Sequence, residues 1–380
     1  MNFERLFDTS MSNPSLKECK AQGKKAIGTI CCHVPEEMIH AAGMLPIHVR
    51  ATGCTDNSEA ETWMSSLSCS YARSCLQYLM DGTYDLDGFI ASDGCMMATR
   101  VYDNWEYMNP NKDKQYMHLL AAPRVIKEHS IDYYKGELND IKEGIEKFIG
   151  VQITDEKLKA SVALYNETRR LIRELYELRK ADNPVISGTD TLKITLAATS
   201  MPKEEFNELL RAFLADAKNR TPITDHRIRL MVIGSALDDP EYTRVIEEKG
   251  GLIVTDALCY GSRYLWEPVE LDDADVLGSI AKSYITRPVC PRMVDPEFHD
   301  QLHNLIINMA KEYKVDGIIY QKMQNCECWG GELVYLDDLM KKANIPMLVV
   351  EREELMANSG QLAIRAEAFI EMIDAEEALA

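Results

Sequence analysis

Cysteine is the residue type in this chain whose placement most favours metal chemistry, because thiolates bind transition metals and iron–sulfur clusters. The 380 residues include 11 cysteines. Three groups follow segments that resemble β-strands, and these groups are Cys31 with Cys32, Cys95 alone, and Cys326 with Cys328. Ligands in open α/β sheets bind beyond the carboxyl ends of the strands, so thiols from separate loops can converge there.

Spacing alone leaves two interpretations of the cysteines open. One is a scattered three-cysteine site, and the commoner one is that free cysteines are small buried apolar residues. The second interpretation best suits Cys19, Cys54, Cys259 and Cys290. No C-x-x-C pair is present, which disfavours a zinc ribbon, a thioredoxin-type redox site and a ferredoxin-type run of ligands.

The local sequence favours metal binding near Cys69 and at Cys95. Cys69 and Cys75 lie near the start of a predicted helix, where the local positive field and free N–H groups stabilise a thiolate. Gly94 precedes Cys95 and permits a tight turn and the close approach of a bulky inorganic group.

Acidic and imidazole side chains suggest less chemistry than the thiols. Glu36 and Glu37 are expected to stabilise the first turn of a helix rather than to act as acid–base catalysts. The eight histidines show no metal-ligand spacing in this interpretation, and His33 and His40 are expected to be structural.

Composition limits the class of protein. Lys and Arg number 42 and Asp and Glu 61, and the net charge of −19 disfavours nucleic-acid binding. No apolar run approaches the roughly 18 residues that span a bilayer, and the first residues lack signal-peptide features. We therefore expect a cytoplasmic protein that binds no membrane. The chain also lacks P-loop, dinucleotide-binding and nucleophile-elbow motifs.

The elements that must position the thiols follow a βαβα alternation, which predicts an α/β fold with doubly wound parallel sheets. Strands are predicted at residues 25–30, 45–49, 86–91, 118–122, 229–233, 252–255, 317–320 and 346–350. Helices are predicted at residues 35–43, 64–80, 96–108, 131–149, 155–181, 202–217, 240–249, 296–313, 333–342 and 361–373. We expect an N-terminal α/β domain at 1–130, a helical insertion or bridge at 131–225 and a C-terminal α/β domain at 226–380.

Several segments in collinear order carry a resemblance to a known family. They are VPEEMIHAAGMLP (34–46), SCSYARSCLQYLMDGTYDLDGFIASDGC (68–95), VYDNW (101–105), ALYNETRRLIRELYELRK (163–180), DALCYGSR (256–263), NCECWGGE (325–332) and SGQLAIRAEAF (359–369). Together they resemble the 2-hydroxyacyl-CoA dehydratase and benzoyl-CoA reductase family, which includes double-cubane cluster proteins. The resemblance implies two stacked flavodoxin-like domains with a helical region.

The resemblance also implies a cofactor. Subunits of the family hold an oxygen-sensitive iron–sulfur cluster through three cysteines, and the matching positions here are Cys69, Cys95 and Cys326. Three protein ligands on a 4Fe–4S cluster leave one iron open. Cys75 and Cys328 compete with Cys69 and Cys326 for these roles. The family often has Asp-Pro after its third cysteine, where this chain has Glu327 and Cys328.

The reaction implied by the resemblance is reductive and needs a separate ATP-hydrolysing activator with its own cluster, which delivers one low-potential electron. Dehydratases then form a ketyl radical from an acyl-CoA and expel a hydroxyl group, whereas benzoyl-CoA reductases reduce an aromatic ring. A third branch carries a double-cubane cluster, of which one chain would supply half, and reduces other small molecules. Segments 163–180 and 256–263 are closer to the reductase and double-cubane branches.

The partner implied is a homologous or identical second subunit, and a homodimer would favour the double-cubane branch. A non-catalytic electron-transfer subunit is the alternative of a different class. Arg263 is a candidate contact for a CoA phosphate or a substrate carbonyl. Ser359, Gln361 and Arg365 are further candidates, because the last helix opens near them with an anion-binding N-terminus. A salt bridge for Arg263 and a helix cap for Ser359 are the competing interpretations.

Overall fold

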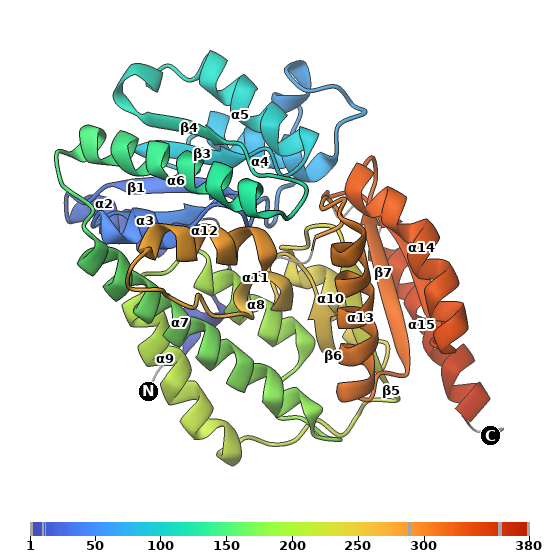
Figure 1. Ribbon diagram of the computed structural model, residues 1–380. Coiled ribbons are helices and arrows are strands. Elements are labelled where there is room, and N and C mark those ends of the chain that lie inside the picture. The colour runs from blue at the N-terminus through green and yellow to red at the C-terminus, as the bar shows by residue number, and fades with distance from the viewer. Residues whose placement is uncertain (1–2, 10, 12, 288–289, 356–358, 378–380) are drawn as a thin grey trace.

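Two four-stranded parallel sheets form the framework of the protein, as seen in a computed structural model (Figure 1). The structure describes residues 3–9, 11, 13–287, 290–355 and 359–377. The strand order is β2-β1-β3-β4 in the first sheet and β6-β5-β7-β8 in the second, so both sheets repeat one topology. This order is the flavodoxin-like one, in which ligands bind where the order reverses. The predicted fold class is confirmed.

All eight predicted strands are present. Their bounds are β1 Ala26–Ile30, β2 Leu45–His48, β3 Gly88–Ser92, β4 Tyr116–Leu120, β5 Ile228–Gly234, β6 Gly251–Ala257, β7 Gly317–Met323 and β8 Met347–Arg352. Every residue of β1, β3, β5 and β6 is buried, as expected for parallel strands covered on both faces.

The helices agree less closely with the predictions. Their bounds are α1 Glu4–Phe7, α2 Pro14–Ala21, α3 Glu36–Ala41, α4 Ser70–Met80, α5 Met96–Met108, α6 Glu128–Ile149, α7 Asp155–Glu177, α8 Gly188–Ala198, α9 Lys203–Asp216, α10 Pro240–Glu247, α11 Ser262–Leu265, α12 Val276–Thr286, α13 Pro296–Glu312, α14 Glu327–Ala343 and α15 Ser359–Glu377. None of the described helices is both long and apolar enough to cross a bilayer.

Two helix starts were wrong in ways that matter for the site. Helix α4 begins at Ser70 rather than at residue 64, because the preceding Cys69 has an extended backbone with φ −63° and ψ 139°. Helix α14 begins at Glu327 rather than at residue 333, since its two glycines do not interrupt it. Helices α8 and α12 were not predicted, because their threonine, serine and glycine content weakens the helical pattern.

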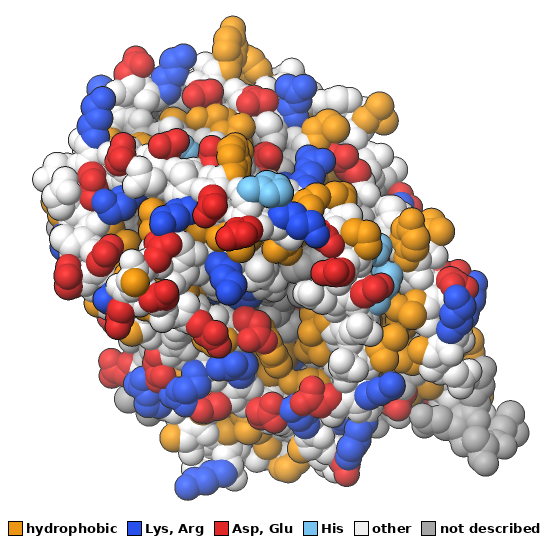
Figure 2. Space-filling view, in the orientation of Figure 1, with side chains coloured by type: hydrophobic (Ala, Val, Ile, Leu, Met, Phe, Trp, Pro, Cys, Tyr) orange, Lys and Arg blue, Asp and Glu red, His pale blue; other side chains and the backbone are white. Residues whose placement is uncertain are grey.

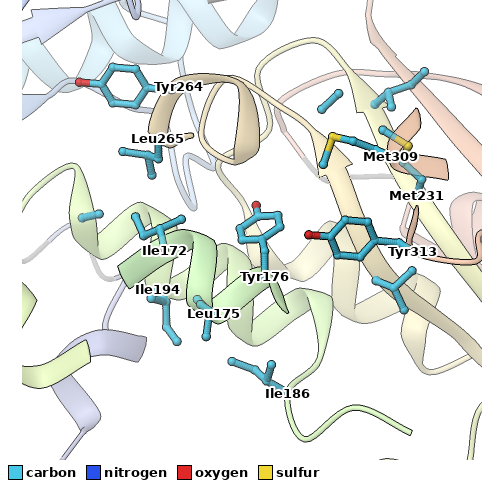
Figure 3. Close-up of a cluster of buried hydrophobic side chains, with 14 of the residues drawn as sticks. Ile172, Leu175, Tyr176, Ile186, Ile194, Met231, Tyr264, Leu265, Met309 and Tyr313 are labelled. Carbon is cyan, nitrogen blue, oxygen red and sulfur yellow. The ribbon is translucent and has the colours of Figure 1, made fainter. Parts of the chain in front are cut away.

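The helices of residues 131–225 pack on both sheets. Side chains of α7, α8 and α9 form one hydrophobic cluster with β5, β6 and β7 of the second sheet. Figure 3 shows part of it, with Ile172, Leu175 and Tyr176 of α7 on one side and Met231 and Tyr313 on the other. Helix α6 instead packs on the first sheet. Helix α12, from the second half of the sequence, packs against α6 (Figure 1).

Buried ion pairs join helix α3 to the helical region. Glu37 Oε1 lies 2.5 Å from Arg169 Nη2 of α7, and Tyr284 of α12 donates its hydroxyl hydrogen to Glu37 Oε2 at 2.5 Å. Glu36 Oε2 lies 3.1 Å from Lys203 Nζ of α9. The two glutamates therefore bind helices far away in the sequence, beyond the local first-turn role that we expected.

The environment of these carboxylates favours their charged form. Burial by itself raises the pKa of Glu36, but Lys203 and His48 bring it down to about 2. Burial likewise opposes the charge of Glu37, whereas Arg169 and Arg287 lower its pKa below the ordinary value. The native pairs therefore stabilise the fold above the pKa of an ordinary glutamate, and this contribution is lost as acid protonates them.

We expect Glu37→Gln to lower the free energy of unfolding by about 3–5 kcal/mol near neutral pH, because it leaves Arg169 buried without its partner. Urea unfolding measured from neutral to acid pH checks this. The deficit should shrink as the pH falls below the ordinary glutamate value of 4.5, because unfolded wild type then takes up a proton at Glu37 that the native state, with its lowered pKa, binds only at lower pH. Asp337→Asn, which breaks an exposed i,i+4 pair with Lys341, is the control and should change stability little.

Candidate metal centre

A cavity of about 140 Å³ lies where the carboxyl ends of strands from the two sheets meet. Eight of the 11 cysteines line it: Cys31, Cys32, Cys69, Cys95, Cys259, Cys290, Cys326 and Cys328. Most of them follow strands β1, β3, β6 and β7, which is the position that doubly wound sheets use for ligands. The wall between the thiols is largely apolar and includes Met97, Met323 and Trp329.

Three helix N-termini converge on this cavity. Cys69, Cys95 and Cys326 are the N-cap residues of α4, α5 and α14, respectively. The Cys95 sulfur accepts a hydrogen bond from the backbone N–H of Ala98 at 3.4 Å. Each helix start presents unpaired N–H groups and a partial positive charge, and both stabilise a thiolate. The three cysteines named from the sequence thus share one local environment.

A glycine permits close packing at the cavity wall. A Cβ atom added to Gly94 would lie far inside contact distance of the sulfur of Cys31. Cys31 itself has a left-handed backbone with φ 82°, which L-residues rarely adopt. The loops after β1 and β3 therefore pack closely at Gly94, against the Cys31 thiol. The close approach of an inorganic group at Gly94 stays a prediction.

Adjacent thiols at Cys31 and Cys32 polarise one another. The Cys32 thiol donates a hydrogen bond to Cys31, and this bond lowers the pKa of Cys31, with a further contribution from Arg292. The same bond raises the pKa of Cys32, and burial adds to the effect. His33 follows, with Nδ1 3.2 Å from the carbonyl oxygen of Tyr284, and its buried Nε2 has no hydrogen-bond partner among the described residues. Burial lowers the pKa of His33 to about 3, so its ring is neutral.

A buried arginine supplies positive charge beside the thiols. Arg263 Nη2 donates a hydrogen bond to the Cys259 sulfur at 2.8 Å, and its guanidinium lies 5.1 Å from the ring centroid of Trp329. Burial raises the pKa of Cys259 to about 11, although Arg263 opposes the shift. The arginine that we considered as a substrate contact therefore faces the thiol cavity.

Cys69 and Cys95 are strongly desolvated. Burial raises the pKa of Cys69 to about 12 and also raises that of Cys95, while neighbouring cysteines add to both shifts. A cation bound among the sulfurs would therefore stabilise the thiolate form of these two cysteines. The all-sulfur donor set fits a soft transition metal or an iron–sulfur cluster.

Two phenols add polar groups to the cavity wall. The hydroxyl groups of Tyr71 and Tyr260 form a short hydrogen bond with each other, and both lie 3.4 Å from the Val49 carbonyl oxygen. Burial raises the pKa of both tyrosines, so both remain protonated. They are the phenolic proton donors among the residues that line the cavity.

The structure separates some competing cysteines and leaves others together. Cys75 does not line the cavity; its sulfur is buried 4.0 Å from the Val49 carbonyl oxygen. Cys326 and Cys328 both line the cavity. Cys19 and Cys54 lie elsewhere, with their sulfurs near backbone oxygens of Lys25 and Asp56.

Other substrate candidates lie away from the thiols. Gln361 and Arg365 line a separate pocket of about 240 Å³ beside β8, and Arg365 donates a hydrogen bond to the Val349 carbonyl oxygen at 2.7 Å. Ser359 opens helix α15 and is half-buried. Of the four candidates, Arg263 is the one at the cysteine cavity.

Sequence reasoning missed two cysteines of the cavity. Cys259 and Cys290 were grouped with ordinary buried cysteines, yet both are on the cavity wall. Cys259 follows strand β6, so the strand-end rule applied to Cys95 could have identified it. Cys290 follows α12 and nothing in its local sequence points to the cavity.

Comparisons with known proteins cover almost the whole chain. The (R)-phenyllactyl-CoA dehydratase beta subunit of Clostridium sporogenes is 26% identical over 97% of each chain. A subunit of the benzoyl-CoA reductase of Thauera aromatica is 26% identical over 89% of this chain and 87% of its own. The (R)-2-hydroxyglutaryl-CoA dehydratase subunit beta of Acidaminococcus fermentans is 28% identical over 94% of this chain and 95% of its own.

A family model described as 2-hydroxyglutaryl-CoA dehydratase, D-component, matches residues 31–373. That range contains all eight cysteines of the cavity. The match confirms the resemblance that the sequence segments carried. This chain therefore belongs to the 2-hydroxyglutaryl-CoA dehydratase D-component family, among whose relatives are subunits of 2-hydroxyacyl-CoA dehydratases and of benzoyl-CoA reductase.

Proposed function

We propose that this chain is the iron–sulfur subunit of a reductive enzyme of its family, with the cluster in the cysteine cavity. One observation carries the proposal: three cysteines at helix N-termini and five more thiols line a single cavity between the sheets. Cys69, Cys95 and Cys326 are the ligands that we assign to a 4Fe–4S cluster. Such a cluster supplies one electron at low potential to a small molecule.

The residues around the thiols have distinct roles in this proposal. Helix N-termini and Arg263 offset the negative charge of the sulfurs. Met97, Met323 and Trp329 exclude water from the cavity and so keep the local dielectric low. The hydroxyl groups of Tyr71 and Tyr260 hold protons that a reduced substrate could accept.

Partners follow from the same proposal. The relatives are named as subunits, which supports a second, homologous or identical, subunit. The chain has no P-loop, which agrees with a separate ATP-hydrolysing iron–sulfur activator as the source of electrons. An acyl-CoA or another small molecule would be the substrate, and the cytoplasm the compartment. An electron-transfer subunit without its own catalytic role is the alternative.

The number of thiols favours one branch of the family. A single four-iron cluster needs three or four cysteines, and this cavity has five beyond the three assigned ligands. Cys31, Cys32, Cys259, Cys290 and Cys328 could hold further iron in the same space. We therefore propose, as a second candidate, a double-cubane reductase of small molecules that acts as a homodimer.

Ligand assignment is tested by counting iron and sulfide in variants purified without oxygen. We expect Cys95→Ala to lose most of its iron and the electron paramagnetic resonance signal of the reduced protein. Cys75→Ala and Cys19→Ala should keep both, because neither thiol lines the cavity. A colourless wild-type protein from anaerobic cells would contradict the proposed cofactor, and equal iron in all variants would remove Cys95 from the ligands.

Cluster size distinguishes the two candidates. A single cubane, or half of a double cubane shared by two chains, predicts about four irons per chain and no loss in Cys259→Ala or Cys290→Ala. A complete double cubane held by the thiols of one chain, which is the second candidate, predicts about eight irons per chain and a partial loss of iron in both variants. Cys54→Ala is the matched control outside the cavity. Four irons in wild type, unchanged in these variants, would leave the single cubane or the shared double cubane.

The packing of Gly94 against Cys31 predicts a further effect. Gly94→Ala should displace the Cys31 sulfur, because the added Cβ would overlap it, and we expect the variant to bind less iron. Gly136→Ala in helix α6 is the control, since no atom lies within 4 Å of its added Cβ. The control should keep its iron and gain about 1 kcal/mol of stability. Full iron in both variants would show that Cys31 can move freely.

A further inference from the structure

Two histidines and a glutamate meet outside the cysteine cavity, between helices α13 and α14. His299 and His303 are one turn apart on α13, and their rings lie 4.9 Å apart, centroid to centroid. His299 Nε2 is 2.8 Å from Glu332 Oε2, and His303 Nε2 is 2.7 Å from Glu332 Oε1. Both imidazoles thus direct the same nitrogen at one carboxylate of the neighbouring helix.

The carboxylate at the centre of this group is buried. The side chain of Glu332 is 2% exposed, whereas those of His299 and His303 are 27% and 16% exposed. Within the described residues, no lysine or arginine forms an ion pair with Glu332. A buried carboxylate without a cation is costly, so a bound positive charge would stabilise this arrangement.

We propose that His299, His303 and Glu332 bind a divalent transition metal ion of the zinc type. Two histidines at i and i+4 on one helix face with a carboxylate from another element form a known zinc-ligand set. The three ligand atoms lie within 4.8 Å of one another. Tetrahedral ligands about 2.0–2.2 Å from zinc stand about 3.3–3.6 Å apart, so the two contacts to Glu332 need to open by less than about 1 Å.

The place of the site in the fold gives the ion a structural role. It joins α13 to α14, and α14 is the helix that begins after Cys326 and carries Cys328 and Trp329 on the cavity wall. Glu332 lies in the next turn of that helix. A metal there fixes the helix that presents two cavity thiols, and one ligand position stays open to solvent.

These side chains contradict one expectation drawn from the sequence. We expected no metal-ligand spacing among the eight histidines, yet His299 and His303 are four residues apart in a predicted helix. The spacing was visible, but Glu332 is far from it in the sequence. The proposal does not depend on the cluster, because no cysteine belongs to this group.

Titration with Zn²⁺ tests the proposal on the anaerobically purified chain, after a chelator has removed loosely bound metal. Calorimetry should show about one equivalent bound by wild type and a loss of that equivalent in His299→Ala and in Glu332→Gln. His129→Ala, an exposed histidine on α6, should bind as wild type does. Iron content and thermal unfolding in the presence of chelator verify that each variant is folded. If Glu332→Gln does not fold, the loss of zinc binding in His299→Ala tests the proposal by itself.

Co²⁺ identifies the donor atoms, because thiols of the cavity could also take up zinc. Binding at the proposed site should give visible d–d bands without the intense near-ultraviolet charge transfer of cobalt thiolates, and His299→Ala should abolish them. Zinc uptake that is equal in wild type and variants, or a cobalt spectrum dominated by thiolate bands, would overturn the proposal. Glu332 would then be satisfied by its two hydrogen bonds alone.

Discussion

Concentrating eight thiols in a buried cavity imposes the constraint on which the rest of the structure depends. Each sulfur becomes a good ligand only when it loses its proton, and burial opposes that loss. Three helix N-termini and the guanidinium of Arg263 lie at the same wall, and their positive charge favours the thiolate form. Two sheets of identical topology provide these helix starts, because in such sheets helices begin just beyond the strand ends.

Charged and polar groups contribute to fixing the position of the two sheets relative to each other. Glu36 and Glu37 of α3 pair with Lys203 and Arg169, and Ala51 donates its backbone N–H to Asp238 at 2.6 Å across the junction. Breaking such buried pairs is expensive, whereas their formation adds little net stability. They are therefore better understood as fixing one geometry for the junction in which the cavity lies. On the outer surface, acidic and basic side chains are instead interspersed over the face shown in Figure 2.

The strands could be predicted from the sequence because buried parallel strands are short apolar runs, and the strand-end rule then located Cys95 and Cys326. The helix start at Cys69 was missed, although the serines before it weaken the helical pattern, because the extended backbone of Cys69 has no signature in the local sequence. Cys290 and the pairing of Glu332 with two histidines depend on contacts between distant segments, which no local pattern contains. Family resemblance supplied the ligand triad, the strand-end rule had already pointed to Cys31, Cys32 and Cys328, and the geometry added Cys259 and Cys290.

Helix α12 has a consequence for how the protein is made. It lies late in the sequence but covers α6 and the first sheet through Ile280, Tyr284 and their neighbours. A ribosome will therefore have released the whole first sheet well before the helix that shields it has been synthesised. Cys31 and Cys328 are the first and last thiols of the cavity in sequence, so the cavity cannot be complete until Cys328 has been synthesised. A metal site that uses thiols from both of these segments can therefore be completed only after that point.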